Sequence, residues 1–403
     1  MRILVLWHDF PSPYWGGVLP IFNLLKYFSE EHNIALLSFF RKTAEMKWKH
    51  PDLWSSCDVI ETVVLPLPST PSPRAVPIAL RNMLLHAISK KTSLTLLSPF
   101  YSPEMQAKLK RLLNGREFDL ILTSGQMAFY VSEINLSKIV VPFDARSENY
   151  FLMYKNVKNP IMKISWLLLH LREKIYESTI YKSFDACIVV THRDRLLLQR
   201  RSPHAGISVI PNGVDFDYFK PMSLKKEHWS LIFVGSMNQL PNIDGVLRFY
   251  REIYPLIKKE VPKVKLYIVG ANPTKEIVRL TANESVIVTG YVEDIRPYLD
   301  KALVVIAPMF YGVGIKNKIL EAMAMGKAIV TTTNGIEGID AIPEKHVITA
   351  DTAEEFAKRV IELLHDDQLR NKIEKNARKL VEEKYSWRRI ANAYNSMFEK
   401  VVK

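Results

Sequence analysis

Short runs of β-branched and aliphatic residues alternate with segments of helical period in the C-terminal half of the chain. Five apolar runs predict strands, at 231–234, 265–269, 286–288, 304–307 and 328–331. Apolar residues at helical spacing predict helices between several of these strands, over 243–258, 317–325 and 353–364. The strands are apolar along nearly their whole length, as expected when helices cover both faces of a parallel sheet. The pattern therefore predicts a doubly wound α/β domain.

The N-terminal half repeats this alternation. Its apolar runs predict strands at 2–7, 34–38, 119–122, 138–141 and 186–190. A proline and an Asn-Gly turn within 210–215, followed by a polar loop, predict a domain boundary there. We therefore expect an α/β fold of two Rossmann-like domains facing across a cleft, at 1–211 and 212–385. The last segment, 386–403, has helical spacing and is expected to pack back on the first domain.

Composition narrows the class of protein. The chain has 403 residues, 48% of them hydrophobic, which is enough for two separate cores. Cys57 and Cys187 are far apart, so neither a disulfide framework nor a zinc site is indicated. No apolar run approaches the roughly 20 residues needed to span a bilayer, and none at the start resembles a signal peptide. We expect a cytoplasmic protein.

The net charge of +13 indicates an anionic partner. Nucleic acid, an acidic lipid surface and a phosphorylated small molecule are the candidates. The sequence lacks an RNA-binding sheet motif, a zinc finger and a basic leucine zipper, which argues against nucleic acid. The other two partners stay open.

The most informative stretch follows the strand at 304–307. Gly312 and Gly314 allow the backbone to approach a ligand closely, and the helix that follows presents free amide groups to an anion. Lys316 and Lys318 lie near the start of that helix, where the helix dipole disfavours cations. They therefore indicate a bound diphosphate, with solvated surface lysines as the alternative.

Glu321 lies five residues beyond Lys316, about 7.5 Å along a helix. This distance matches the offset between a diphosphate and a ribose. A carboxylate there would accept hydrogen bonds from two ribose hydroxyls. The alternative is an ordinary glutamate on a helix surface.

The sequence Gly-Val-Gly-Ile-Lys-Asn-Lys-Ile-Leu-Glu-Ala-Met-Ala-Met-Gly-Lys, at 312–327, resembles the donor-binding segment of GT-B glycosyltransferases of the GT4 family. Further segments that resemble the family are 210–215, 233–237, 241–244, 290–294 and 337–339. The resemblance is strong over 210–340 and weak in the N-terminal half. The most similar subgroup is that of bacterial polysaccharide-associated sugar transferases. It implies a GT-B fold and a retaining hexosyltransferase that moves a sugar from a nucleotide diphosphate-sugar to a polysaccharide, lipid-linked or other acceptor.

The resemblance also implies roles for individual residues. Glu321 would bind the donor ribose, and Lys318 the diphosphate. Val292 would contact the base through its main chain, and Gly235 and Ser236 would face the phosphates. The remaining loop residues that would surround the donor are Gly312, Val313, Gly314, Ile315, Lys316 and Asn317.

Two departures from the family pattern stand out. Val313 occupies the position at which many members carry a first glutamate, and Asn238 and Asn242 lie where an Arg/Lys pair is usual. We hypothesise that Lys316 and Lys318 supply the missing charge. Because Val313 replaces a carboxylate, an inactive sugar-nucleotide-binding partner in a polysaccharide assembly complex is one alternative function. A GT-B epimerase or phosphorylase is the other.

In the N-terminal half, Gly16 and Gly17 follow the first strand and precede a predicted helix. In the family such a pair contacts donor phosphate or acceptor, and a plain turn is the alternative. Asp144 follows the strand at 138–141, where the resemblance implies a catalytic His or Asp. Helix capping is the alternative for Asp144. Ser124-Gly125-Gln126 is a weaker candidate for acceptor binding.

We expect Asp144, Lys318 and Glu321 to carry the reaction. No carboxylate is evident as the nucleophile of a double displacement. We therefore favour front-face attack assisted by the leaving diphosphate, which lysines and helix amides would stabilise. The donor half has no Asp-x-Asp motif, so no metal or other cofactor is expected, and no Gly-x-Gly-x-x-Gly follows a strand, which argues against a nicotinamide or flavin enzyme.

The segment 74–116 is strongly basic. It contains one acidic residue, Glu104, and eight basic ones: Arg74, Arg81, Lys90, Lys91, Lys108, Lys110, Arg111 and Arg116. Apolar residues are interleaved with them, so the segment is expected to lie on an anionic membrane surface at the inner face of the plasma membrane. The alternative is a core helix with a solvated basic face.

Overall fold

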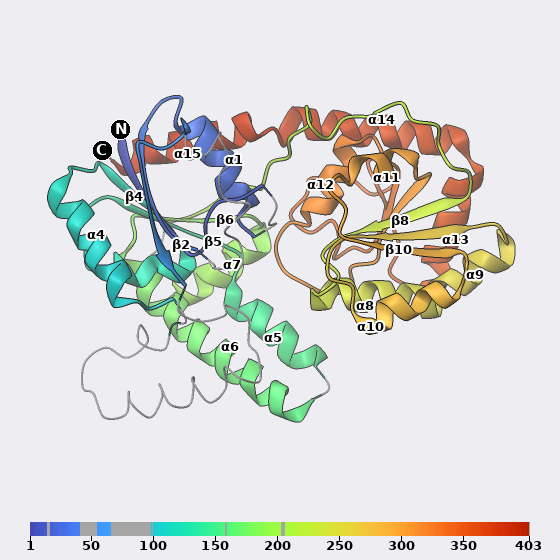
Figure 1. Cartoon of the computed structure of the whole chain (residues 1–403), viewed down its shortest axis with the longest axis horizontal. Coiled ribbons are helices and arrows are strands. Elements are labelled where there is room, and N and C mark those ends of the chain that lie inside the picture. Colours follow the sequence, from blue (N-terminus) through green and yellow to red (C-terminus); the bar gives the residue numbers. More distant parts are fainter. Residues whose placement is uncertain are drawn as a thin grey trace. The chain divides into compact units, whose positions relative to one another are not determined.

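The computed structural model describes residues 1–13, 17–40, 55–65, 98, 100–157, 159–202 and 206–402. The chain divides into two compact units (Figure 1). Unit 1 comprises Met1–Ile210 with Ile390–Lys403, and unit 2 comprises Pro211–Arg389. Each unit is built on a parallel sheet with helices around it, which confirms the predicted pair of Rossmann-like α/β folds. Within the described ranges, no helix is long and apolar enough to cross a membrane.

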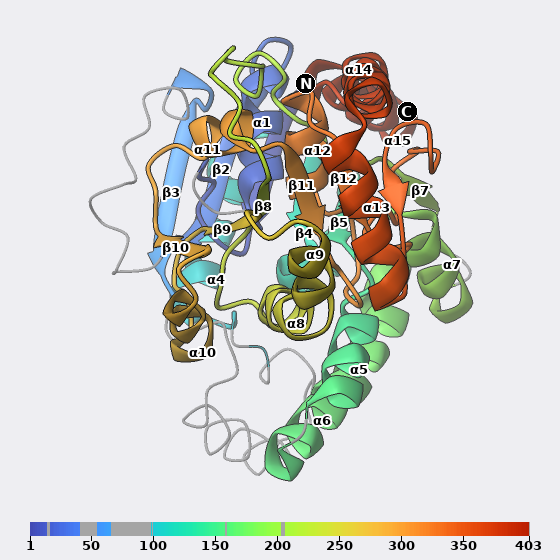
Figure 2. The same cartoon turned by 90° about the vertical axis from the view of Figure 1, so that its right-hand side faces the viewer.

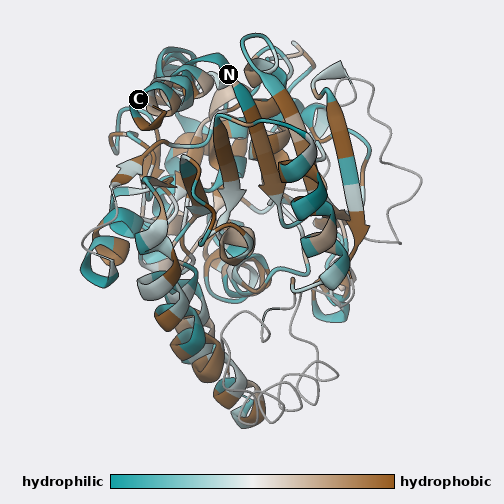
Figure 3. Cartoon of the chain, turned by 90° about the vertical axis from the view of Figure 1, so that its left-hand side faces the viewer, coloured by the Kyte–Doolittle hydropathy of each residue, from teal (hydrophilic) through white to brown (hydrophobic). Residues whose placement is uncertain are grey.

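The sheet of unit 1 has the strand order β3-β2-β1-β4-β5-β6-β7. Its strands are β1 Arg2–Trp7, β2 Asn33–Phe40, β3 Val59–Val64, β4 Leu120–Ser124, β5 Lys138–Phe143, β6 Ala186–Val189 and β7 Ile207–Val209. The five predicted strands are confirmed, and their hydrophobic character is visible in Figure 3. β3 and β7 were not predicted because they form the edges of the sheet, where partial exposure permits polar residues.

The sheet of unit 2 has the order β10-β9-β8-β11-β12-β13. Its strands are β8 Ser230–Val234, β9 Lys265–Val269, β10 Val286–Gly290, β11 Val304–Ala307, β12 Ile329–Thr331 and β13 Ile348–Thr349. The five predicted strands are again confirmed, whereas the two-residue β13 is too short to produce a pattern. The strand order reverses between β8 and β11, so the loops after these two strands border the crevice in which such sheets bind ligands.

Helices cover both sheets. Among the described residues, those of unit 1 include α1 Leu19–Phe28, α4 Pro103–Gly115, α5 Arg146–Asn156, α6 Pro160–Ile180 and α7 His192–Arg201. Those of unit 2 are α8 Leu240–Arg248, α9 Tyr254–Glu260, α10 Lys275–Val278, α11 Arg296–Lys301, α12 Asn317–Ala324, α13 Ala353–His365 and α14 Asp367–Lys384. Figure 2 shows α5 and α6 running side by side, and α12 packs against α14.

The helix predicted over 243–258 is interrupted. A π-helical turn, Phe249–Ile253, separates α8 from α9. Pro255 explains the break, because proline lacks an amide hydrogen and its ring clashes with the carbonyl four residues earlier. The last helix, α15 Trp387–Val401, was predicted, and its Phe398 ring lies 5.1 Å from that of Phe28 in unit 1.

Candidate active site

A glycine loop, residues 308–316, connects β11 to α12 in unit 2. Gly312 has a φ of +123° and Gly314 a φ of +71°. Side chains other than hydrogen are disfavoured in this left-handed region, so both turns require glycine. Val313, between the two glycines, and Ile315, directly after them, are partly buried.

Lys316 braces the glycine loop from within. Its Nζ donates hydrogen bonds to the carbonyl oxygens of Gly314, at 2.8 Å, and Gly312, at 3.3 Å. The side chain is buried, so these carbonyls have little access to water. Lys316 therefore fixes the path of the loop, and its ammonium group is directed into the loop.

Asn317, the first residue of α12, is anchored by Asn212. The Nδ2 of Asn212 donates to the Oδ1 of Asn317 over 2.9 Å, and Asn212 is buried. Gly213 follows in the same turn, where a Cβ atom would come within 2.7 Å of the Trp387 ring. The segment 210–215, which resembles the family in sequence, thus holds the start of α12 in place.

Lys318 points from the first turn of α12 toward the end of β8. Its Nζ donates to Asn242 Oδ1 over 2.6 Å and lies 4.3 Å from the centre of the Phe233 ring. Asn242 in turn donates from Nδ2 to the carbonyl oxygen of Ser236 over 2.9 Å. One buried amide therefore links the lysine to the loop after β8.

Gly235 leaves space for this lysine. A Cβ atom at Gly235 would lie 2.8 Å from Lys318 Nζ and 2.8 Å from Asn242 Nδ2. The neighbouring Ser236 is exposed, and its Oγ donates to Asn238 Oδ1 over 2.8 Å. The cation that the family places after β8 is thus absent from that loop, and the ammonium group beside it comes from α12.

Glu321 lies three residues after Lys318, on the same face of α12. Burial raises the pKa of the Glu321 carboxyl to about 7, although the charge of Lys318 opposes this shift. Burial also lowers the pKa of the Lys318 ammonium to about 7, against the charge of Glu321. Both groups therefore titrate in the neutral range.

Val292 follows β10 and packs its side chain against the hydrophobic core of unit 2. The preceding Tyr291 is exposed. This packing fixes the main chain at Val292 close to the end of β10. A ligand could then contact the backbone there without displacing the side chain.

In unit 1, Asp144 comes directly after β5. The preceding Phe143 has a φ of +65°, an unusual value for a phenylalanine, so the chain turns sharply just before Asp144. The residue at the N-cap of α5 is Ala145, whose side chain makes no capping hydrogen bond, and Glu177 of α6 accepts the amide of Ser147 in the first turn.

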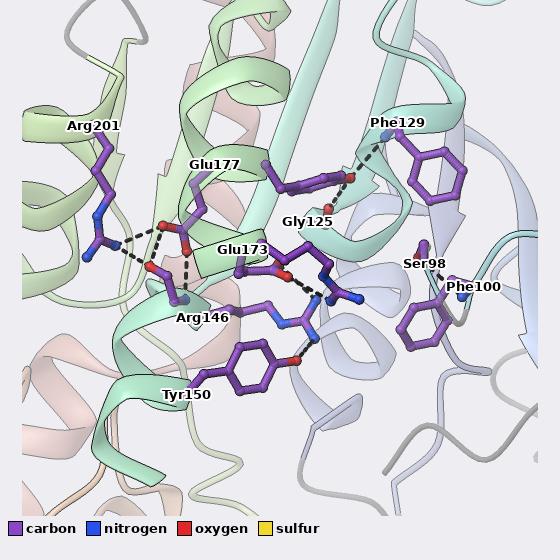
Figure 4. A network of polar contacts seen from close by, with 12 residues as sticks. Ser98, Phe100, Gly125, Phe129, Arg146, Tyr150, Glu173, Glu177 and Arg201 are labelled. Atoms are coloured by element: carbon purple, nitrogen blue, oxygen red, sulfur yellow. Dashed lines mark hydrogen bonds and ion pairs between the residues drawn. The ribbon is translucent and has the colours of Figure 1, made fainter. Parts of the chain in front are cut away.

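A network of ionised side chains joins α5 and α6 (Figure 4). Arg146 Nη1 is 3.3 Å from Glu173 Oε1, and Arg172 Nη2 is 3.1 Å from Glu173 Oε2. Arg146 Nη2 also donates to the hydroxyl of Tyr150 over 2.6 Å. The negative charges of Glu173 and Asp144 both favour the charged form of the Arg146 guanidinium and raise its pKa, against desolvation.

This network borders a small hollow. The hollow is lined by Ser98, Phe100, Gln126, Arg146, Arg172, Glu173 and Tyr176. Gln126, singled out in the sequence for acceptor binding, is thus brought to the same place as Arg146. Arg172 and Glu173 could not be found from the sequence, because they belong to α6, which begins 14 residues after Arg146, and their pattern there is that of ordinary surface charges.

Glu177 joins three helices of unit 1. It is fully buried and accepts hydrogen bonds from the amide of Ser147, at 2.9 Å, and from Arg201 Nη1, at 2.8 Å. These contacts tie α5, α6 and α7 together (Figure 4). They hold Arg146 and Glu173 in register without facing the hollow.

Two further sequence predictions concern unit 1. Gly16 lies outside the described residues, and Gly17 is exposed with open space around its α-carbon, two residues before α1. Most of the basic segment 74–116 also lies outside the described residues. Its described end, α4, packs Met105, Leu109 and Leu112 into the core, so that part is a core helix with a basic outer face.

Part of the chain matches a known protein family. Residues 229–366 match the family model described as glycosyl transferases group 1. The chain is 22% identical over 308 residues to an uncharacterized 44.6 kDa protein in the cps region of Klebsiella pneumoniae, covering 73% of this chain and 77% of that protein. It is 21% identical over 344 residues to the capsular polysaccharide biosynthesis glycosyltransferase CapM of Staphylococcus aureus, covering 79% and 87%.

Solved structures share the fold. Sucrose-phosphate synthase from Thermosynechococcus elongatus has a TM-score of 0.73 at 17% identity, with 99% of each chain covered. HepE of Anabaena, in complex with UDP, has a TM-score of 0.68 at 14% identity, covering 99% of this chain and 100% of HepE. Residues 229–366, which contain the glycine loop, thus belong to the group 1 glycosyltransferases, the GT4 family, and the chain with its two parallel sheets has the GT-B fold.

Proposed function

We propose that this glycosyltransferase moves a hexose from UDP-hexose, with retention of the anomeric configuration, to a saccharide or lipid-linked saccharide during polysaccharide synthesis. The observation that carries the proposal is the placement of Lys318 beside Gly235, one turn of α12 ahead of Glu321. The complex of HepE with UDP supports a uridine nucleotide, and the similarity to CapM supports a polysaccharide product.

On the donor side, the diphosphate would lie against Lys318, Gly235, Ser236 and the free amides at the start of α12. Because burial lowers the pKa of Lys318 to about 7, an anion beside it would favour its protonated form. Glu321 would accept hydrogen bonds from the ribose hydroxyls, and the main chain at Val292 would contact the base. The backbone from Gly312 to Asn317 would follow the sugar diphosphate.

On the acceptor side, the proposal rests on the edge of the first sheet that follows β4 and β5. Asp144 would accept a hydrogen bond from the attacking hydroxyl or orient the transferred hexose. Gln126 and Arg146 line the adjacent hollow and offer an amide and a guanidinium to acceptor hydroxyls. Gly16 and Gly17 would contact phosphate or acceptor from the loop after β1.

The chemical step would proceed at the front face of the sugar. The acceptor oxygen forms its bond to the anomeric carbon on the side from which the diphosphate leaves, and the hydroxyl proton passes to a phosphate oxygen. Lys318 and the amides of α12 stabilise the negative charge that develops on the leaving group. Retention follows because both bonds lie on the same face.

Thermal unfolding with a panel of nucleotide diphosphates and nucleotide sugars tests the donor assignment. A ligand at 100 times its dissociation constant stabilises the protein by about 2.7 kcal/mol, which is easily measured. We expect UDP and UDP-hexoses to stabilise the wild type and to have little effect on Glu321→Ala. Another nucleotide as the best ligand would overturn the uridine assignment, and binding without turnover on any acceptor would favour the inactive-partner alternative.

A further inference from the structure

The outer face of α6 carries a continuous stripe of exposed aliphatic side chains. The stripe residues are Ile161, Ile164, Leu168, Leu171 and Ile175. Their exposed fractions lie between 47% and 69%. The spacing of three and four residues places all five on one face, over about 21 Å of helix. Isolated exposed aliphatic residues are normal, whereas a contiguous row marks an interaction surface.

The opposite face of α6 already has its partners. Trp166, Glu173, Tyr176 and Glu177 are buried there. Tyr176 donates to the carbonyl oxygen of Gly125, and Glu177 binds Ser147 of α5. Figure 3 shows hydrophobic segments recurring between hydrophilic ones along the helical hairpin that α5 and α6 form. The stripe is therefore not a displaced part of the core of unit 1.

The solvent-facing charges of α5 and α6, in their described residues, are positive. The acidic residues of α5 and α6 in the described part of the hairpin are Glu148, Glu173 and Glu177, and arginines pair with all three. The charged side chains left facing solvent are lysines. Lys155 and Lys174 are exposed, and Lys163 is half-buried, 5.2 Å from the centre of the Tyr154 ring. The outer face thus combines aliphatic residues with positive charge.

We infer that this face of α6 docks onto an anionic lipid bilayer. A helix that binds at such an interface buries its apolar face at the level of the acyl chains and places lysines among the phosphates. The lysines beside the stripe match the lipid phosphates in charge, whereas the same face of a second copy of this chain would carry the same positive charge and repel it. The inference does not depend on the donor chemistry, and it uses residues outside the basic segment 74–116.

Sedimentation of the full-length protein with vesicles tests this inference. The vesicles contain phosphatidylcholine alone or phosphatidylcholine with phosphatidylglycerol. We expect binding to the anionic vesicles, weakening as salt is raised. The triple variant Ile164→Gln, Leu168→Gln, Leu171→Gln should bind the anionic vesicles at least about tenfold more weakly than the wild type. The matched control is Leu256→Gln, Val278→Gln, Ile342→Gln, which removes three exposed aliphatic residues of unit 2 and should bind as the wild type does.

A charge series separates the electrostatic part. Lys155→Glu, Lys163→Glu, Lys174→Glu should abolish the salt-dependent binding, whereas Lys372→Glu, Lys375→Glu, Lys379→Glu on α14 should weaken it much less. A fluorophore attached at Ile164→Cys should shift its emission to shorter wavelength on anionic vesicles, and one at Ile342→Cys should not.

Three results would overturn the inference. The wild type could ignore anionic vesicles at low salt, or the stripe variant could bind them unchanged. The wild type could also form a dimer, measured by light scattering, that the stripe variant loses, with no vesicle binding by either. That last result would assign the face to a second copy of the chain.

Discussion

Lys318 Nζ lies 2.6 Å from Asn242 Oδ1, and this contact joins α12 to the loop after β8. The Asn242 amide is orientated by its second hydrogen bond, to the carbonyl oxygen of Ser236. The family pattern has cationic side chains after β8, and here two asparagines stand in that region. In this chain the ammonium group therefore comes from α12, and Asn242 holds it at the end of β8.

Asn242→Ala should weaken donor binding by about tenfold, because a hydrogen bond to a charged group contributes about 1.5–3 kcal/mol. Asn242 acts through Lys318, so the effect should fall on KM for the donor more than on kcat. The Asn242→Ala, Lys318→Ala double variant should bind the donor no more weakly than Lys318→Ala alone. Additive losses would show that the two residues act separately. Asn371→Ala, on the exposed side of α14, is the control.

The two loop lysines should differ in effect. Lys318→Ala should lower kcat about a hundredfold, because a donor to the leaving group is lost. Lys316→Ala should lower the free energy of unfolding by about 1–3 kcal/mol, because the carbonyls of Gly312 and Gly314 lose a partner. Lys259→Ala is the control. Lys258 is unsuitable because it donates to Ser285 Oγ at 2.7 Å. Equal kinetic losses in both loop variants would contradict this division.

The pH dependence of donor affinity should be bell-shaped, with both limbs near pH 7. Below this pH Glu321 becomes protonated, since burial raises its pKa to about 7, and its carboxylate no longer accepts both ribose hydroxyls. Above it Lys318 loses its proton, since burial lowers its pKa to about 7, and its charge no longer attracts the diphosphate. Titration calorimetry with UDP-glucose, which does not itself ionise in this range, measures both limbs.

Variants assign the two limbs. Glu321→Gln should remove the acid limb, and Lys318→Arg should remove the alkaline one because arginine stays protonated. Glu260→Gln, at the exposed end of α9, should keep both. A flat profile for the wild type would mean that neither group controls binding.

The fold was predictable wherever burial imposes a pattern. The ten strands that were predicted are apolar runs, and the candidate donor residues from Gly312 to Glu321 form one continuous segment, so both could be recognised. Contacts between residues that are far apart in the sequence could not be predicted. Asn242 and Lys318 are 76 positions apart, and Glu173 reads as a surface charge until α6 packs on α5. The stripe on α6 was equally hidden, since its spacing is that of any core helix.

Asp144→Asn should lower kcat by about 10²–10⁴-fold and leave donor affinity unchanged, because the carboxylate would act on the hydroxyl or the transferred sugar. Asparagine keeps the shape of the side chain, so the turn after Phe143 should survive, and an unchanged melting temperature checks this. Asp217→Asn, on an exposed loop of unit 2, is the control. Normal turnover by Asp144→Asn would remove this residue from the reaction.

Gly270 and Gly235 meet where β8 and β9 end, and their alanine variants should fail in different ways. A Cβ atom at Gly270 would lie 1.9 Å from the carbonyl oxygen of Gly235, and Gly270 has a φ of +145°. Gly270→Ala should therefore lower the free energy of unfolding by about 2–6 kcal/mol. Gly115→Ala, which meets no atom within 4 Å, should change it by less than about 1 kcal/mol.

At Gly235 the added methyl group would instead meet the ends of two side chains, Lys318 Nζ and Asn242 Nδ2, both at 2.8 Å. These can move aside, so Gly235→Ala should keep nearly the wild-type stability. It should lose donor affinity about as much as Asn242→Ala does, because the ammonium group is pushed from its place beside β8. Chemical denaturation and nucleotide titration of the same preparations separate the two losses. If Gly235→Ala unfolded as readily as Gly270→Ala, the space at Gly235 would serve the fold rather than the lysine.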